Sequence, residues 1–321
     1  MPKDKALIFG CSGQDGSLLS KSLIRQGYVV YGASRHKSKT LGNHAKLGIE
    51  HKVNSLSLDI RSKDDVLDTI KRISPKEIYI LAAQSSVGLS FIKPSETLET
   101  NILGTLNVLE ALRIIKYEGR AFFAGSSEVF GESIKPISLE TKVNPQSPYA
   151  VSKLAAQNLV KGYRDAYKLK IMTGILFNHE STLRNENFVT KKIINGAMKS
   201  AKNKNYKIEL GNIHIVRDWG WAEEYVEAMQ IITRSEKISD QIICTGKKVS
   251  LEDFIEKVYK NFNLNWSEHV IINEELYRPT DIKISYGDPT KLKNSNNWRA
   301  KINIDEIITK LIADKIRNDS V

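Results

Sequence analysis

The sequence predicts an α/β fold in which a doubly wound parallel sheet is covered by helices on both faces. Three observations support this: short apolar runs alternate with longer amphipathic segments, the apolar runs are continuous, and a glycine-rich turn follows the first of them. Continuous apolar runs are typical of parallel strands that are buried on both faces. The 321 residues suffice for one large domain or two joined units.

Strands and helices are expected to alternate through residue 177, which is the order that builds a doubly wound sheet. The stretch LGTLNVLEALRII (103–115) repeats apolar residues at three- and four-residue steps, as a packed helix does. The expected strands are 6–10, 28–34, 54–60, 77–83, 120–126 and 170–177. The expected helices are 16–26, 62–73, 95–117 and 147–168.

The second half of the chain has shorter and less regular segments. A late apolar run, QIICTG (241–246), is expected to return to the main sheet as a further strand. We therefore predict a sheet domain in residues 1–177, with return segments near 207–246, and a smaller lobe mostly in residues 178–321. The expected helices of this half are near 189–202, 220–234, 250–262 and 303–317.

The chain is basic, with 48 Lys and Arg against 37 Asp and Glu and a formal net charge of +11. Phosphate-bearing small molecules are favoured over nucleic acid as partners, because the lysines form no long run and no nucleic-acid-binding motif is present. No stretch approaches the roughly 20 apolar residues that span a bilayer, and MPKDKALIFG lacks a signal-peptide layout. Cys11 and Cys244 are far apart, which indicates neither a disulfide framework nor a metal site. We expect a cytoplasmic protein without membrane contact.

The turn FGCSGQDGSLL places Gly10, Gly13 and Gly16 at three-residue spacing between the first strand and the first helix. Glycines permit the tight turn and let a pyrophosphate approach the backbone, while the helix N-terminus supplies amides and partial positive charge. A glycine-rich turn alone is a modest signal, but the flanking strand and helix are those that a dinucleotide requires. The sheet domain is therefore predicted to be of the Rossmann type.

The ends of the second and third strands favour NADP over NAD. Ser34 and Arg35 stand where NAD-binding proteins usually place an acidic residue for the ribose, and a cation there suits a 2′-phosphate. The alternative is an ordinary surface arginine. Asp59 closes the third strand and either meets the adenine or caps the helix that begins near Ser62.

Tyr149 and Lys153 are four residues apart near the start of the helix that follows the fifth strand. That spacing puts both on one helical face. Lowering the tyrosine pKa by about three units requires roughly 4 kcal/mol of differential stabilisation of the phenolate. We expect the nearby Lys153 ammonium to supply much of it. The alternative is an amphipathic helix with a buried tyrosine.

The stretch FAGSSEVFGE (123–132) places Ser126 and Glu128 after an apolar run. Such a glutamate is either part of a solvated turn or an acid/base group held at the edge of the sheet. The glycine loop, the strand-end serine and Y-x-x-x-K together resemble the extended short-chain dehydrogenase/reductase superfamily. Longer stretches are similar to the GDP-mannose 4,6-dehydratase family along nearly the whole chain: SGQDGSLL, LAAQSSV, SSEVFGE, YAVSK, ILFNHES, ENFVTKKI, RDWGWAEEYVEAM, YRPTDI and GDPTK.

The resemblance implies a specific chemistry. Tyr149 would remove the proton of the sugar 4-hydroxyl, assisted by Ser126 and Lys153, while NADP takes the hydride from C4. Glu128 would then remove the C5 proton and help to expel the C6 hydroxyl as water. The hydride returns to C6 and gives a 4-keto-6-deoxy sugar. Elimination needs one acid/base group more than a simple reduction does, and Glu128 fits that role.

The resemblance also implies the binding residues. Further cofactor contacts would come from Gln14, Asp15, Ile60, Ala82 and Gln84. A GDP-sugar would be bound by Ser85, Asn178, Lys192, Arg217 and Arg278. The two arginines would neutralise its diphosphate, with a surface salt bridge as the alternative.

Several positions depart from the family pattern: Thr182-Leu183-Arg184-Asn185 replaces Pro-Arg-Arg-Gly, His36 and Ser86 replace an arginine and a histidine, and Trp221 replaces a histidine. The base or sugar of the substrate can therefore differ from GDP-mannose. A homodimer through helices 95–117 and 147–168 is the smallest assembly expected, and a homotetramer is the larger one. The competing functions are a nucleotide-sugar 4-epimerase or 4-reductase, with Glu128 merely structural, and an inactive NADP-binding regulator.

Overall fold

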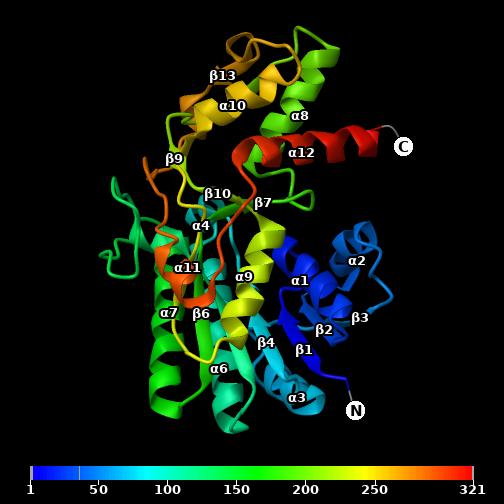
Figure 1. Ribbon diagram of the computed structural model, residues 1–321, viewed down its shortest axis with the longest axis vertical. Helices are drawn as coiled ribbons and strands as arrows, with labels where there is room; N and C mark the ends of the chain where they lie inside the picture. Colours follow the sequence, from blue (N-terminus) through cyan, green and yellow to red (C-terminus); the bar gives the residue numbers. More distant parts are fainter. Residues whose placement is uncertain (1–2, 36, 320–321) are drawn as a thin grey trace.

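The computed structural model describes residues 3–35 and 37–319. Figure 1 shows an elongated molecule in which the main sheet and its helices occupy the lower part and a smaller lobe the upper part. The main sheet has seven strands: β1 (Lys5–Phe9), β2 (Val29–Ser34), β3 (Val53–Ser57), β4 (Glu77–Ile80), β5 (Arg120–Ser126), β6 (Lys170–Leu176) and β11 (Gln241–Ile243).

All pairings in this sheet are parallel, and the strand order is β11-β6-β5-β4-β1-β2-β3. The chain therefore reverses direction across the sheet between β1 and β4, where a doubly wound fold opens a crevice at the carboxyl ends of its strands. The predicted fold class is confirmed. The strand expected at 241–246 is also present, as β11 beside β6.

Helices cover both faces of the sheet. On one face α3, α6 and α7 pack against it through a cluster that includes Val66, Leu109 and Val160. On the other face α1 and α9 pack through a second cluster that includes Leu19 and Met229. These helices are α1 (Gln14–Arg25), α3 (Lys63–Ile73), α6 (Gly104–Ile114), α7 (Pro148–Tyr167) and α9 (Ala222–Arg234).

The helix expected at 95–117 forms as one run in three parts: α5 (Pro94–Leu98), a π-helical turn (Glu99–Leu103) and α6. It is preceded by the short α4 (Val87–Ile92). Helix α2 (Lys37–Lys46), which follows β2, was not predicted, and His36 lies outside the described residues. A 3-10 turn (Ser127–Phe130) follows β5.

The upper lobe in Figure 1 contains α8 (Val189–Lys202), α10 (Leu251–Lys260) and α12 (Ile304–Asp319), which share a core with Phe254 and Leu311. Helix α9 lies within the predicted return segments near 207–246 and packs on the main sheet. Division of the chain at residue 177 remains a prediction. The smaller elements are β7 (Asn178–Glu180), β8 (Ile208–Leu210), β9 (Val216–Arg217), β10 (Trp219–Trp221), β12 (Val249–Ser250), β13 (Val270–Ile272), α11 (Thr290–Asn296) and 3-10 turns at Trp266–Glu268 and Glu274–Leu276.

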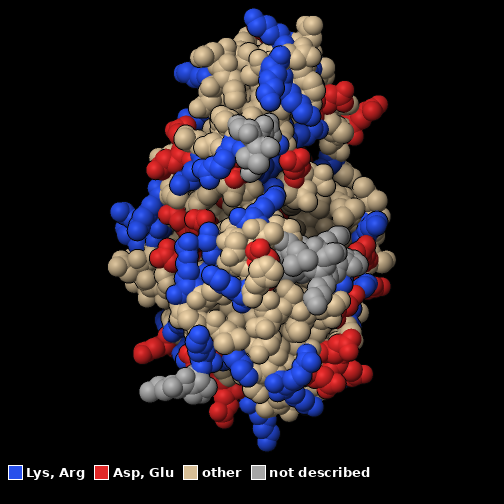
Figure 2. Space-filling model, turned by 90° about the vertical axis from the view of Figure 1, so that its right-hand side faces the viewer, with Lys and Arg blue, Asp and Glu red and all other residues tan. Residues whose placement is uncertain are grey.

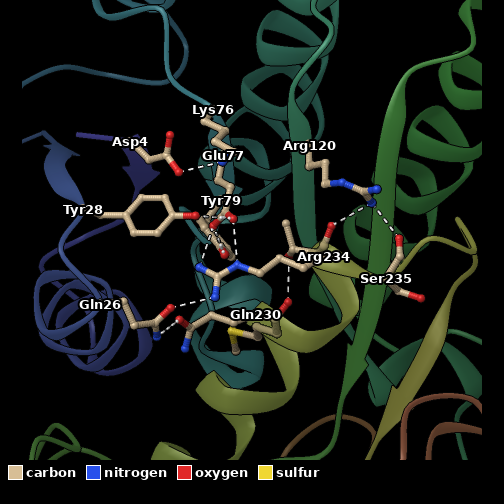
Figure 3. Close-up of polar contacts among 12 residues, drawn as sticks. Asp4, Gln26, Tyr28, Lys76, Glu77, Tyr79, Arg120, Gln230, Arg234 and Ser235 are labelled. Carbon is tan, nitrogen blue, oxygen red and sulfur yellow. Dashed lines mark hydrogen bonds and ion pairs between the residues drawn. The ribbon is translucent and has the colours of Figure 1, made fainter. Parts of the chain in front are cut away.

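A polar network closes the amino end of the sheet (Figure 3). The buried carboxylate of Glu77 accepts hydrogen bonds from the hydroxyls of Tyr28 (2.9 Å) and Tyr79 (2.7 Å). Arg234 of α9 donates to the same carboxylate from Nε (2.7 Å) and a terminal nitrogen (3.1 Å). The network joins α9 to β4 on the side away from the carboxyl ends of the strands, so its role is structural.

The surface carries the expected basic charge in dispersed form. Figure 2 shows Lys and Arg side chains spread over the face it presents, with Asp and Glu between them and no single basic stripe. None of the described helices is long and apolar enough to cross a membrane.

Candidate functional site

The glycine-rich turn packs closely against neighbouring backbone at two of its glycines. Gly10 has φ +87°, and a Cβ there would lie 2.6 Å from the backbone nitrogen of Ala82. A Cβ on Gly16 would lie 2.6 Å from Cα of Cys11 and would also meet the carbonyl oxygen of Gly10. Only glycine therefore permits the tight turn between β1 and α1 and the close packing of the first turn of α1 on it. These residues fit a dinucleotide pyrophosphate.

The first turn of α1 is tied to β7. Asp15 Oδ2 lies 2.9 Å from Nε2 of His179, and Ser181 donates to Gln14 Oε1 at 2.8 Å. Burial alone would raise the pKa of Asp15 and lower that of His179, but their mutual attraction outweighs it and shifts both pKa values in the opposite directions. Gln14 and Asp15 therefore lock the FNHES segment against the glycine loop. Their predicted contacts with the cofactor remain a prediction.

The ends of β2 and β3 carry the residues predicted for the adenosine. Ser34 is buried, and Arg35 is exposed and donates to Glu96 at 3.2 Å. Asp59 does not cap α3, whose N-cap residue is Ser62. Its carboxylate instead accepts from the Arg61 backbone nitrogen (3.0 Å) and from the Arg61 guanidinium (2.7–3.1 Å). The alternative of a helix cap was therefore wrong.

The end of β4 is connected to the helix that carries Tyr149. The buried Asn101 accepts from the backbone nitrogen of Gln84 (2.9 Å) and donates to Ser152 Oγ (2.8 Å), which donates to the carbonyl of Tyr149 (2.7 Å). Gln84 is itself buried and donates to Thr97. Asn101 thereby fixes the spacing between the two elements. It was missed in the sequence because the π-helical turn that orients it has no readable pattern.

Ser126, Glu128 and Tyr149 meet at the carboxyl end of β5. Ser126 is the last residue of the strand, and its Oγ accepts from the backbone nitrogen of Glu128 at 3.3 Å. Helix α7 begins at Pro148 with Ser147 as N-cap, which accepts from the Ala150 nitrogen at 3.1 Å. This start places Tyr149 in the first turn, where its side chain hydrogen-bonds Ser126.

The pKa values of Tyr149 and Lys153 differ from the sequence-based expectation. Burial raises the pKa of Tyr149 to about 12, although the hydrogen bond from Ser126 opposes the rise. Burial lowers the pKa of Lys153 to about 7, and its ammonium nitrogen lies 4.5 Å from the Phe123 ring centroid. The expectation that Lys153 lowers the tyrosine pKa was wrong for the protein alone. A desolvated lysine is only partly charged near neutral pH, so its field is weak.

Glu128 lies in the field of both predicted diphosphate arginines. Burial raises the pKa of Glu128, Arg217 and Arg278 oppose the rise, and Asp281 adds to it. Asp281 Oδ1 is 3.6 Å from Arg217 and 4.0 Å from Arg278. The structure therefore brings a carboxyl of raised pKa and two guanidinium groups into one site. A raised pKa is suitable for a general acid/base group near neutrality.

Backbone pairing explains why these residues converge from distant parts of the chain. Residues 280–288 run between the loop after Glu128 and β9: Ser133 donates to the carbonyl of Ile284 (2.9 Å), and Val216 donates to that of Lys283 (2.7 Å). Asp218, beside Arg217, accepts from the backbone of residues 245, 246 and 287. Asp281 was missed in the sequence because only this pairing places it between the arginines.

The other predicted substrate residues occupy more open positions. Asn178 begins β7, which pairs in parallel with β10, and Ser85 and Lys192 are exposed. The neighbouring Lys191 is buried and lies 3.8 Å from Asp314. Sequence reasoning also missed Arg184, although it noted the altered segment around it. Glu180 accepts two hydrogen bonds from the Arg184 guanidinium (3.1 and 3.2 Å). The charge of Arg184 opposes the rise that burial causes in the pKa of Tyr149.

Two of the unusual residues have structural roles. Ser86 is the N-cap of α4 and accepts from the Leu89 nitrogen at 3.2 Å. Trp221 is buried in the core of the upper lobe, with the Lys310 ammonium 5.6 Å from its ring centroid. These contacts do not test the prediction that the base or sugar differs from GDP-mannose. Within the described part of the chain, no group of three or more His, Cys, Asp or Glu is placed to hold a metal ion.

The doubly wound sheet, the glycine-rich turn and the Ser126–Tyr149–Lys153 arrangement define a dinucleotide-binding protein of the extended short-chain dehydrogenase/reductase class. The family model for GDP-mannose 4,6 dehydratase matches residues 7–311. A relative in Arabidopsis thaliana, GDP-mannose 4,6 dehydratase 1, is 37% identical and covers 98% of this chain and 90% of that protein. This chain therefore belongs to the GDP-mannose 4,6-dehydratase family, and the predicted family is confirmed.

Solved structures support the fold. UDP-glucose 4-epimerase of Thermotoga maritima, solved with UDP-glucose, has a TM-score of 0.87 at 21% identity and covers 99% of this chain and 100% of that one. dTDP-glucose 4,6-dehydratase of Bacillus anthracis, solved with NAD, has a TM-score of 0.86 at 17% identity and covers 99% and 98%. The predicted function, a nucleotide-sugar 4,6-dehydratase, is confirmed by the family. The predicted cofactor is confirmed as well, since NADP is the nicotinamide cofactor of this family.

Proposed function

We propose that this protein is an NADP-dependent 4,6-dehydratase that converts GDP-mannose to its 4-keto-6-deoxy derivative by loss of water. The single observation that carries this proposal is the convergence of Glu128 with Tyr149 and with the two arginines, 217 and 278, at the carboxyl end of β5. Family membership supplies the substrate class, because this chain matches the GDP-mannose 4,6 dehydratase of Arabidopsis thaliana over 90% of that protein's length.

The side chains divide the reaction between them. The glycine-rich turn and the strand-end residues Ser34 and Arg35 would hold NADP, which would supply hydride transfer from C4 of the sugar and back to C6. Tyr149 accepts the proton of the 4-hydroxyl, with Ser126 as its hydrogen-bond partner. Glu128 removes the proton at C5, which a 4-keto group acidifies, and donates it to the C6 hydroxyl, which departs as water. Hydride addition at C6 then requires a proton at C5, which balances the proton that Tyr149 accepted from the 4-hydroxyl. A carboxyl whose pKa is raised by burial can both accept and donate that proton near neutral pH.

The diphosphate is assigned to Arg217 and Arg278. Arg217 is buried within the site, whereas Arg278 lies at its solvent-exposed edge. Guanidinium forks suit phosphate oxygens. Asn178 and Lys192 remain proposed contacts of the nucleotide, and Ser85 a proposed contact of the hexose.

The test is incubation with GDP-mannose and catalytic NADP⁺, followed by mass spectrometry. We expect a keto product that is lighter than the substrate by one water. An unchanged mass with inverted configuration at C4, or a requirement for stoichiometric NADPH, would instead identify a 4-epimerase or 4-reductase. Lack of turnover with GDP-, CDP- and UDP-sugars would favour the inactive regulator.

A homodimer is the proposed assembly. Leu103 and Ile114 on the helical run 99–114, together with Val151 and Tyr167 on α7, are large apolar side chains exposed by 42–50%. Burial of such residues at a shared helical face is typical of a homodimer interface. Light scattering should give twice or four times the 36.2 kDa mass of the chain, and a monomer that persists at micromolar concentration would refute this assignment.

A cytoplasmic location is proposed from the two free cysteines, which are buried.

A further inference from the structure

We propose that Arg61 is a second guanidinium that recognises the 2′-phosphate of NADP, beside Arg35. This inference rests on the proposed NADP dependence and adds a residue that determines specificity. It starts from the position of Arg61, which follows β3 by four residues, as Arg35 follows β2 by one. In a doubly wound fold the adenosine ribose lies at this end of the sheet.

The two strand ends are joined, so the two arginines are neighbours. The Leu58 nitrogen donates to the carbonyl of Ser34 at 2.9 Å, and Ser57 Oγ approaches the carbonyl of Arg35 at 3.5 Å. Helix α6 holds the same turn, since Asn107 donates to the carbonyls of Ile60 (3.1 Å) and Arg61 (2.9 Å). Arg61 is therefore carried on a fixed backbone.

The guanidinium of Arg61 is also oriented. Asp59 holds its Nε and one terminal nitrogen, with distances of 2.7–3.1 Å. Among the described residues, the other terminal nitrogen reaches only the exposed Glu99, at 3.4 Å. A phosphate can take the place of a weak, exposed partner while the strong pair with Asp59 keeps the fork in position.

Arg35 and Arg61 both lower the pKa values of two neighbouring carboxylates, Glu96 and Asp59. The hydrogen bond from Arg35 is the largest influence that lowers the pKa of Glu96, and the charges of Lys93 and Arg61 act in the same direction. The charges of both arginines likewise help to lower the pKa of Asp59, where the hydrogen bond from Arg61 is the largest influence. The cluster thus combines three cations (Arg35, Arg61 and Lys93) with the carboxylates Asp59, Glu96 and Glu99. A bound phosphate must compete with these carboxylates for the guanidinium groups.

Calorimetric binding of NADP⁺ and NAD⁺ to the full chain tests this inference. Arg61→Ala should weaken NADP⁺ binding about ten-fold or more, as expected for loss of a charge-assisted pair, and should change NAD⁺ binding less than two-fold. Glu99→Gln should strengthen NADP⁺ binding, because it removes an opposing charge and releases the guanidinium. The matched control is Arg72→Ala, an exposed arginine in the last turn of α3, which should alter neither affinity.

The outcomes separate this inference from the proposed function. Equal weakening of both cofactors in Arg61→Ala, or unchanged NADP⁺ binding, would overturn the role of Arg61 while leaving the enzyme NADP-dependent. Failure of the unmodified protein to bind either cofactor would refute the proposed function itself. Adenosine 2′,5′-bisphosphate, measured against 5′-AMP, should reproduce the NADP⁺ preference if the 2′-phosphate is the group recognised.

Discussion

Lys153→Met is expected to make the cofactor-free protein more stable while it abolishes turnover. The Lys153 side chain is 4% exposed and lies over the Phe123 ring, and burial lowers its pKa to about 7. A methionine of similar length can occupy the same space without desolvating a charge. The substitution therefore removes a group that is kept for function at a cost in stability.

The magnitude follows from the two pKa values. The unfolded chain keeps the Lys153 proton up to the ordinary lysine pKa of 10.5, whereas the folded protein releases it at a pKa of about 7, so the unfolded state binds more protons between these values. Stability therefore rises with pH across this window. The resulting loss of stability is about 4 kcal/mol at pH 7 and about 2 kcal/mol at pH 9.

Denaturant unfolding at pH 7 and pH 9 measures this effect. We expect Lys153→Met to unfold at higher denaturant than the parent at pH 7, with a smaller difference at pH 9. Lys161→Met is the control, because Lys161 is an exposed residue of the same helix and should show no such pH dependence. A Lys153→Met protein that is less stable than the parent at pH 7 would refute the reasoning.

Three further predictions follow from the contacts. Glu77→Ala should lower the free energy of unfolding by about 3 kcal/mol, because it removes the carboxylate partner of Arg234 and the acceptor of the buried Tyr79 hydroxyl; a loss below 1 kcal/mol would contradict the role of this network. Asn101→Ala should cost about 1–3 kcal/mol, because it leaves buried backbone and hydroxyl groups without partners, and unchanged thermal unfolding would refute it. Asp281→Asn should move the acidic limb of the pH–rate profile to lower pH: Asp281 raises the pKa of Glu128, so its removal lowers that pKa and keeps the base ionised in more acidic solution. A shift to higher pH would show that the sign is wrong.

The sequence predicted the elements that depend on local pattern. Continuous apolar runs located the strands, and the spacing of Gly10, Gly13 and Gly16 located the turn before α1. Helix α2 was missed, because KSKTLGNHAK contains few apolar residues and has no helical stripe.

The site was predictable only where one motif holds its own geometry. Tyr149 and Lys153 share a helical face by their spacing, but the spacing does not report burial, and burial decided both pKa values. The positions of Asn101 and Asp281 depend on pairing between segments far apart in the chain. Such contacts leave no local pattern in the sequence.

The central claim is that Glu128 and Tyr149 act on one sugar ring, and Glu128→Gln tests it most directly. Mass spectrometry of GDP-mannose incubated with this variant and NADP⁺ should show no species lighter by one water, while calorimetry shows unchanged NADP⁺ affinity. The parent protein should form that lighter species under the same conditions. Formation of the dehydrated product by Glu128→Gln at the parental rate would contradict the account.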